Sequence, residues 1–340
     1  MIAHPFTWTF WAAVATGLIL YGAGVRSALA VAWHWSPGAA DGAQLRRERN
    51  WEMACLLGRW ALAGLTGAAL LWLVGVVAVW HGMVPGAMCG TGVLQAMGGH
   101  GVRAMAFWAM ALLALHGWRV LDRLDSHHPD GLLTPTAARV LLLAAPLLVP
   151  AVIHSWLALM HIDPAAPVSC CAAVYDQVLR PTGTGAMGRG GALAAGWLSL
   201  AGGGLLAVLA GLQWRCGGKC SGALPAVVAA GWVVVAAPAV KHLWSAYYYQ
   251  VLSHPCPWCL FLPDHYGAGF AVYGAMAVTL TAGVTLWTAD RVRRRHPLLS
   301  DAATTLMVRA ARRMLLALLL FILLTAGPAL AWKLRTGLWL

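Results

Sequence analysis

The chain has 340 residues, of which 60% are hydrophobic and only 10% are charged, and its formal net charge is +12. Soluble domains average roughly 25% charged residues, so the composition excludes an ordinary soluble domain and indicates a polytopic helical membrane protein. The positive charge does not indicate nucleic-acid binding, because the basic residues are distributed by loop, as in membrane proteins. Tryptophan, a residue typical of membrane interfaces, occurs 19 times.

Apolar segments long enough to cross a bilayer recur along the whole chain. We predict an all-α fold, a polytopic bundle of about eight transmembrane helices in a single integral membrane domain over residues 1–340. In chain order the predicted spans are 6–26, 54–80, 102–121, 138–160, 191–213, 224–250, 267–289 and 314–332.

Basic residues are concentrated in alternate loops. The loops after the first, third, fifth and seventh spans, with the adjoining helix ends, contain most of them: Arg46, Arg47, Arg49, Arg119, Arg123, Arg139, Arg215, Lys219, Arg291, Arg293, Arg294, Arg295, Arg309, Arg312 and Arg313. The positive-inside rule then predicts that both termini lie outside. Lys333 and Arg335 are the exception to this pattern. The bias and the outer thiols described next favour a bacterial inner (plasma) membrane.

This topology sorts the eight cysteines by side. Cys216 and Cys220 fall in a cytoplasmic loop, and Cys55 lies near the inner end of the second span. The remaining cysteines fall on the outer, oxidising side, where disulfides persist: Cys89, Cys170, Cys171, Cys256 and Cys259. Because five is an odd number, a resting protein keeps one of these thiols free or shares it with a partner or a metal ion.

The outer cysteines Cys256 and Cys259 stand in the sequence SHPCPWCLFLPDHYGAGF, directly before an apolar segment. We expect the pair to open a helix, whose dipole would stabilise a Cys256 thiolate, with Pro257 stiffening the turn. This arrangement suits thiol–disulfide exchange. The same pair can instead hold a soft metal ion or form a static disulfide.

Cys170 and Cys171 are adjacent in APVSCCAAVYDQ. Neighbouring cysteines close only a strained disulfide, and strained disulfides are easily reduced. Alternatively the two thiols face different partners, bind one soft ion together, or are adjacent by chance. We favour a functional pair.

Cys89 lies among methionines in MVPGAMCGTGVLQAM, with Met83, Met88 and Met97 nearby. A thiolate surrounded by thioethers suits Cu(I). The alternative is that these methionines fill gaps near a membrane surface.

Four basic side chains lie within or at the ends of the predicted spans: Lys241 and His242 in the sixth, His154 at comparable depth in the fourth, and Arg103 at the start of the third. Charged groups in spans are costly and usually functional. A cation beside a quinone head group would stabilise its reduced, negatively charged forms, which makes these residues candidate cofactor ligands. Lys241 and Arg103 can instead snorkel to the interface, and His154 with His242 can bracket a haem iron.

The stretch PCPWCLF resembles the quinone-reactive pair of DsbB and of the vitamin K epoxide reductase family. The resemblance implies that Cys256 and Cys259 pass electrons to a membrane quinone. It also implies that Cys170 and Cys171, with Cys89 as a further candidate, exchange with a soluble thioredoxin-like protein.

We therefore expect a membrane thiol–disulfide oxidoreductase at the periplasmic face, linked to quinone and embedded in the lipid bilayer. One alternative is a copper-handling or copper-transport protein served by a soluble metal carrier. Its ligands would come from the outer thiols together with Met88 and His254. A second alternative is a structural subunit that joins other membrane subunits and whose cysteines form static disulfides.

Overall fold

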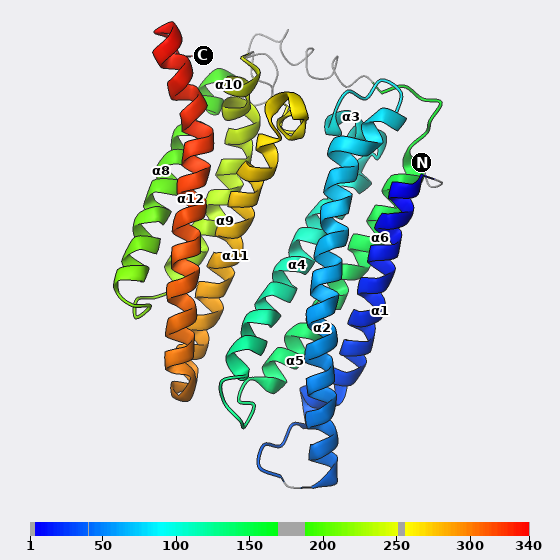
Figure 1. Cartoon of the computed structure of the whole chain (residues 1–340), viewed down its shortest axis with the longest axis vertical. Coiled ribbons are helices and arrows are strands. Elements are labelled where there is room, and N and C mark those ends of the chain that lie inside the picture. Colours follow the sequence, from blue (N-terminus) through cyan, green and yellow to red (C-terminus); the bar gives the residue numbers. More distant parts are fainter. Residues whose placement is uncertain (1–3, 40, 169–187, 251–255, 340) are drawn as a thin grey trace. The chain divides into compact units, whose positions relative to one another are not determined.

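The computed structural model describes residues 4–39, 41–168, 188–250 and 256–339. In these ranges the chain forms helices and no strand, which confirms the all-α prediction (Figure 1). Three predicted site residues, Cys170, Cys171 and His254, lie outside the described residues.

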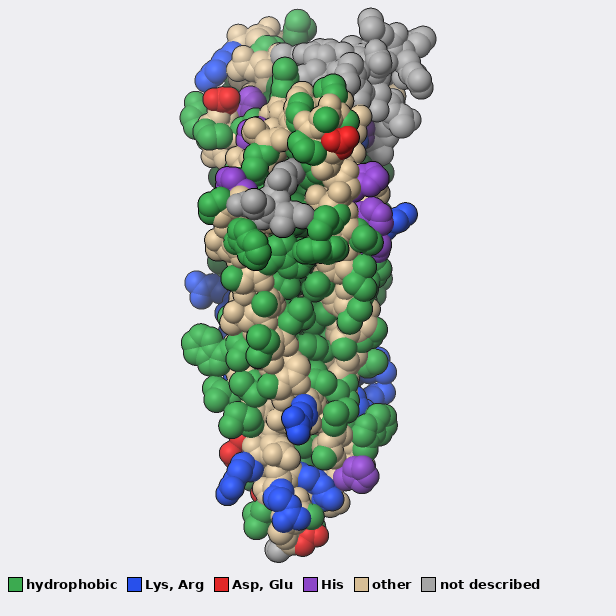
Figure 2. Space-filling model, turned by 90° about the vertical axis from the view of Figure 1, so that its right-hand side faces the viewer, with side chains coloured by type: hydrophobic (Ala, Val, Ile, Leu, Met, Phe, Trp, Pro, Cys, Tyr) green, Lys and Arg blue, Asp and Glu red, His purple; other side chains and the backbone are tan. Residues whose placement is uncertain are grey.

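Within the described ranges, eight helical segments are long and apolar enough to cross a membrane, so the chain is a multi-pass membrane protein in a lipid bilayer. Each predicted span overlaps one of them. Their bounds are Pro5–His34, Gly42–Met83, Gly99–Asp125, Thr134–His161, Gly190–Arg215, Ala223–Tyr249, Ala268–Arg295 and Pro297–Thr336. On the face drawn in Figure 2, hydrophobic side chains cover the middle and a group of lysine and arginine side chains lies at the lower end.

The chain divides into two compact units. Unit 1 contains Met1–Val79, Ala96–Asp163 and Thr288–Thr304, and unit 2 contains Trp80–Gln95, Pro164–Trp287 and Thr305–Leu340.

In unit 1, α1 packs along α2 and α4 packs along α6. The elements of this unit are α1 (Pro5–His34), α2 (Gly42–Val74), the π-helical η1 (Gly75–Val79), α4 (Gly99–Asp125), α5 (Thr134–Leu143) and α6 (Ala145–His161). Close approach of α1 and α2 depends on small residues: a Cβ atom on Gly17 would lie 2.8 Å from Leu65 Cδ2. Small residues at such crossings let membrane helices pack by van der Waals contact.

A buried ion pair joins α2 and α4 in unit 1. The Asp122 carboxylate is 3% exposed and accepts two hydrogen bonds of 3.0 Å from Arg59 and one of 2.7 Å from Arg119. The buried thiol of Cys55 hydrogen-bonds the same carboxylate and borders a cavity of about 470 Å³. Cys55 is therefore part of the polar network around Asp122.

In unit 2, the core is built on α8 and α9, with α12 against them. The elements are η2 (Trp80–Met83), α3 (Gly90–Ala96), α8 (Gly188–Arg215), α9 (Ala223–Ala239), the π-helical η4 (Val240–Trp244), α10 (Ser245–Tyr249), η5 (Cys259–Phe261), η6 (Pro263–His265) and most of α11 (Ala268–Arg295) and of α12 (Ser300–Thr336). The end of α11, the short η7 (Pro297–Leu299) and the start of α12 belong to unit 1. The indole of Trp232 donates a hydrogen bond of 2.8 Å to the Ser199 carbonyl and packs edge-on against Phe321. Gly202 makes room for this indole, because a Cβ there would lie 2.9 Å from it.

The sixth span is interrupted near its C-terminal end. Pro238 lies inside α9 and removes one backbone donor, and the π-helical turn η4 follows directly. π-Helical turns inside α-helices are frequent at functional sites. Lys241 and His242, two of the predicted cofactor ligands, both stand on this turn.

Candidate functional site

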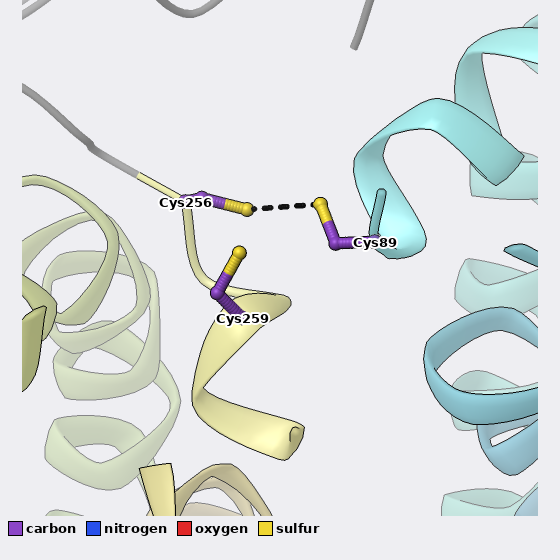
Figure 3. A group of neighbouring side chains, drawn as sticks. All are labelled: Cys89, Cys256 and Cys259. Atoms are coloured by element: carbon purple, nitrogen blue, oxygen red, sulfur yellow. Dashed lines mark hydrogen bonds between the residues drawn. The ribbon is translucent and has the colours of Figure 1, made fainter. Parts of the chain in front are cut away.

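Three cysteines of unit 2 bring their sulfur atoms together (Figure 3). The Sγ atoms of Cys89, Cys256 and Cys259 all lie within 4.8 Å of one another, and those of Cys89 and Cys256 are 3.5 Å apart. All three are reduced cysteines rather than members of a disulfide. Cys89 and Cys256 are almost fully buried, with exposed fractions of 2% and 1%. Among the described residues this is the one group of three or more His, Cys, Asp or Glu side chains placed to share a metal ion.

Backbone hydrogen bonds fix the position of Cys89 directly before α3. Its carbonyl accepts hydrogen bonds from the amide of Gly92, at 3.1 Å, and from the amide of Val93, at 3.4 Å. Thr91 in the first turn of α3 then places its hydroxyl oxygen 3.2 Å from Cys256 Sγ. One short turn thus supplies both a thiol and a hydroxyl to the cluster.

The C-x-x-C segment forms a tight 3₁₀ turn, and the expectation that it opens the long apolar helix is wrong. The amide of Leu262 donates a hydrogen bond of 3.0 Å to the Cys259 carbonyl, and the backbone of Leu262 is extended, with a ψ of 152°. Residues before proline disfavour the α conformation, and Pro263 follows. Gly267 then takes a φ of +60°, and α11 begins only at Ala268. A long-helix dipole therefore does not act on Cys256.

Hydrogen bonds among the thiols take the place of that dipole. Donation from Cys259, and next from Cys89, lowers the pKa of Cys256 well below its ordinary value against the opposing effect of burial, with Thr91 contributing further. The pKa of Cys259 is raised, because its proton is held in the hydrogen bond to Cys256 and because it is partly buried. Cys256 is therefore the thiolate of the pair.

Aromatic side chains enclose the cluster. Trp258 packs on Gly90, where a Cβ atom would lie 3.0 Å from Trp258 Cγ. Phe261 stacks between Trp258 and Tyr273, with ring centroids 6.0 and 5.5 Å apart. These contacts lock the loop of Cys89 against the C-x-x-C turn, where the Cys89 and Cys256 side chains are almost fully buried and Cys259 is partly buried.

Tyr249, at the end of α10, holds the backbone of the turn. Its hydroxyl donates to the Cys256 carbonyl, and its ring lies 4.5 Å from that of His265. Neither contact was predicted from the sequence, and neither were those of Thr91 and Gly90. Thr91 and Gly90 meet residues more than a hundred positions away, and Tyr249 meets its partners across an irregular segment, so none of these contacts produces a periodic pattern in the sequence. Only the position of Thr91 two residues after Cys89 indicates its role.

The other predicted ligands lie elsewhere. Met88 is 67% exposed, and Met97 is fully buried in the core of unit 1, as gap-filling methionines are. Lys241 and His242 stand on η4 in unit 2. In unit 1, His154 pairs with His100 across a 3.0 Å contact between their Nδ1 atoms, and Arg103 is exposed on α4. The structure thus brings together Cys89, Cys256 and Cys259.

Comparisons with protein-family models, with curated proteins and with solved structures found no match to this chain. The three-thiol cluster and the membrane-spanning fold are therefore the observations on which a function is proposed.

Proposed function

We propose that the protein is a thiol–disulfide oxidoreductase of the bacterial inner membrane, whose redox centre is Cys89, Cys256 and Cys259 at the periplasmic face. The observation that carries this proposal is the proximity of three thiols drawn from two loops, with one thiol held as a thiolate. A structural disulfide needs two cysteines. A third within 4.8 Å provides the nucleophile for exchange.

The environment of the pair indicates which sulfur meets a partner. Attack on a Cys256–Cys259 disulfide is favoured at Cys259, because Cys256 is 1% exposed and its low pKa makes it the better leaving thiolate. A mixed disulfide therefore forms on Cys259. The second thiol of the partner then attacks the partner's own sulfur in this mixed disulfide, which leaves a disulfide in the partner and releases the Cys259 thiol.

The electrons need an acceptor in the membrane, for which we propose a quinone. Oxidation of the Cys256–Cys259 dithiol to a disulfide releases two electrons and two protons, which reduce one quinone to the quinol. Exchange with a reduced dithiol protein of the thioredoxin-like class restores both thiols and leaves a disulfide in that protein. The relative reduction potentials set the direction of flow. Lys241 on η4, in the same unit, is the candidate cation for the quinone head group.

Trapping the mixed disulfide tests this function. We expect Cys256→Ser to abolish quinone reduction. The double variant Cys89→Ser/Cys256→Ser leaves Cys259 without a resolving thiol. With a thioredoxin-like protein in its disulfide form, the Cys259 thiol should attack that disulfide, release one partner thiol and accumulate a covalent complex, seen by mass spectrometry. Cys216→Ser, which changes an exposed cysteine of another loop, is the control and should behave as the wild type. Unchanged quinone reduction in Cys256→Ser would refute the proposal.

One observation favours a second candidate function, the handling of a soft metal ion such as Cu(I). With metal–sulfur bonds of about 2.3 Å, two sulfur ligands at the tetrahedral angle lie about 3.8 Å apart, close to the 3.5 Å between Cys89 and Cys256. Anaerobic loading with Cu(I) distinguishes the two functions. One tightly bound ion that protects all three thiols, in a protein that does not reduce quinone, would favour metal handling.

A further inference from the structure

Three histidines gather in unit 1, and the proposed function uses none of them. His100 is the second residue of α4, and His154 and His161 belong to α6. The Nδ1 atoms of His100 and His154 face each other at 3.0 Å, and the ring centroids of His100 and His161 are 6.2 Å apart. His100 thus lies within reach of both other rings.

The packing of α4 on α6 produces this arrangement. His154 and His161 are seven residues apart, so they lie on one face of α6 about 10 Å apart along its axis. The neighbouring pair Trp108 and Ser155 fixes the register with a hydrogen bond of 3.0 Å. Phe107 stacks on the His154 ring with centroids 5.6 Å apart, which holds that ring in place.

A glycine admits the third imidazole. Gly98, which precedes α4, has a φ of +58°, and a Cβ atom there would lie 3.2 Å from the His161 ring. The absence of a side chain at this position therefore lets the ring come close to the start of α4. Two independent features, the register of the helices and this glycine, place the three rings in one patch.

The separation of the two nitrogens suits a shared metal ion. With metal–nitrogen bonds of about 2.0–2.1 Å, two imidazole ligands lie about 2.9 Å apart at a right angle and about 3.3 Å apart at the tetrahedral angle. The 3.0 Å between His100 and His154 is close to the right-angle value, which is the geometry preferred by Cu²⁺ with nitrogen ligands. If the ring that donates in this contact takes the tautomer with its hydrogen on Nε2, both Nδ1 lone pairs become available without loss of a proton.

We propose that His100 and His154 bind a divalent transition-metal ion of the Cu²⁺ type, with the ring of His161 at the border of the site. The site is separate from the thiol cluster and stands whether or not the protein is an oxidoreductase. Both rings of the pair are partly exposed, so positions remain open for water or a fourth ligand. Arg103, on the next turn of α4, adds a positive charge nearby, and we therefore expect an exchangeable ion.

Electron paramagnetic resonance of Cu²⁺ bound to the full-length protein tests the site. Cys89, Cys256 and Cys259 are replaced by serine and the remaining accessible thiols are blocked, because Cu²⁺ oxidises thiols. We expect one equivalent of Cu²⁺ whose spectrum shows hyperfine splitting from at least two nitrogens. His100→Ala and His154→Ala should each lower the affinity at least tenfold, since loss of a mere outer-shell partner already costs about 10–100-fold.

The matched control is His34→Ala, which changes the exposed histidine that ends α1 and should not alter Cu²⁺ binding. His100→Gln and His154→Gln serve if an alanine variant does not fold, because glutamine retains hydrogen bonding but has no imidazole nitrogen. Equal affinity in the wild type and in the His100 and His154 variants, or no Cu²⁺ binding at micromolar concentration, would overturn the proposal and leave a histidine pair that only shares a hydrogen bond.

Discussion

The hydroxyl of Thr91 lies 3.2 Å from Cys256 Sγ, and Thr91→Val removes it with little change in side-chain shape. When Cys256 is a thiolate, this hydroxyl must donate to it. Loss of the donor destabilises the charged form, so the pKa of Cys256 rises and the thiolate fraction at a given acidic pH falls. The direction of the change follows from the contact alone.

The size of the effect follows from the number of donors. A hydrogen bond to a charged group contributes about 1.5–3 kcal/mol, and one pKa unit corresponds to about 1.4 kcal/mol. Cys259 and Cys89 contribute more than Thr91 and remain in the variant. We therefore expect the lower end of the range, an increase of about one pKa unit.

Nuclear magnetic resonance of the protein labelled with ¹³Cβ-cysteine measures this pKa without a reagent that must reach a buried sulfur. Cys256→Ser assigns the signal, and Thr91→Ser, which keeps the hydroxyl, is the control. If the Cys256 signal titrates at the same pH in Thr91→Val and Thr91→Ser, the hydroxyl does not stabilise the thiolate and the account of this site is wrong.

Two further variants test the packing of the units. Gly90→Ala places a methyl carbon 3.0 Å from Trp258 Cγ and should lower the free energy of unfolding by about 1–3 kcal/mol, measured by thermal unfolding in detergent. The control is Gly204→Ala, whose methyl group meets nothing within 4 Å. Equal melting temperatures of the two variants would contradict the packing of Trp258 on Gly90. Asp122→Asn weakens the pairing with Arg59 and should lower the free energy of unfolding by about 2 kcal/mol, which is less than for a fully buried pair because Arg59 is partly exposed. An unchanged melting temperature would show that the ion pair does not stabilise the fold.

The membrane-spanning fold was predictable because hydropathy reports directly on the environment of each segment. The segment 54–80, for example, is apolar throughout and lies inside the observed helix Gly42–Met83. The observed helix begins earlier, because a charged segment with Asp41 as its N-cap extends it beyond the apolar core. Hydropathy alone does not report such an extension.

The loop charges predicted that Cys89, Cys256 and Cys259 lie on one side of the membrane, together with Cys170 and Cys171. They did not predict that these three thiols meet, and they did not predict the geometry of the C-x-x-C segment. The signals against a helix were present in Pro263 and Gly267, but the apolar residues around them resemble the start of a span.

The contacts that tune the site could not be read from the sequence. Thr91 and Cys256 are 165 residues apart, and His100 and His154 are 54 apart. Side-chain pairs of this kind depend on how loops and helices settle against each other. When the histidines were compared by their depth in the predicted spans, the pair that matched was His154 with His242, not His154 with His100.

The closeness of Cys89 to both cysteines of the C-x-x-C turn also links the choice of disulfide pairing to the stability of the fold. A Cys256–Cys259 disulfide closes a loop of four residues and, by chain entropy, stabilises the folded chain by about 2 kcal/mol. A Cys89–Cys256 disulfide spans 167 residues and on the same basis contributes about 5 kcal/mol. The two isomers have the same number of electrons, yet they differ by about 3 kcal/mol in resistance to unfolding. A shift of the disulfide by one sulfur atom would therefore change how firmly the two loops are tied together.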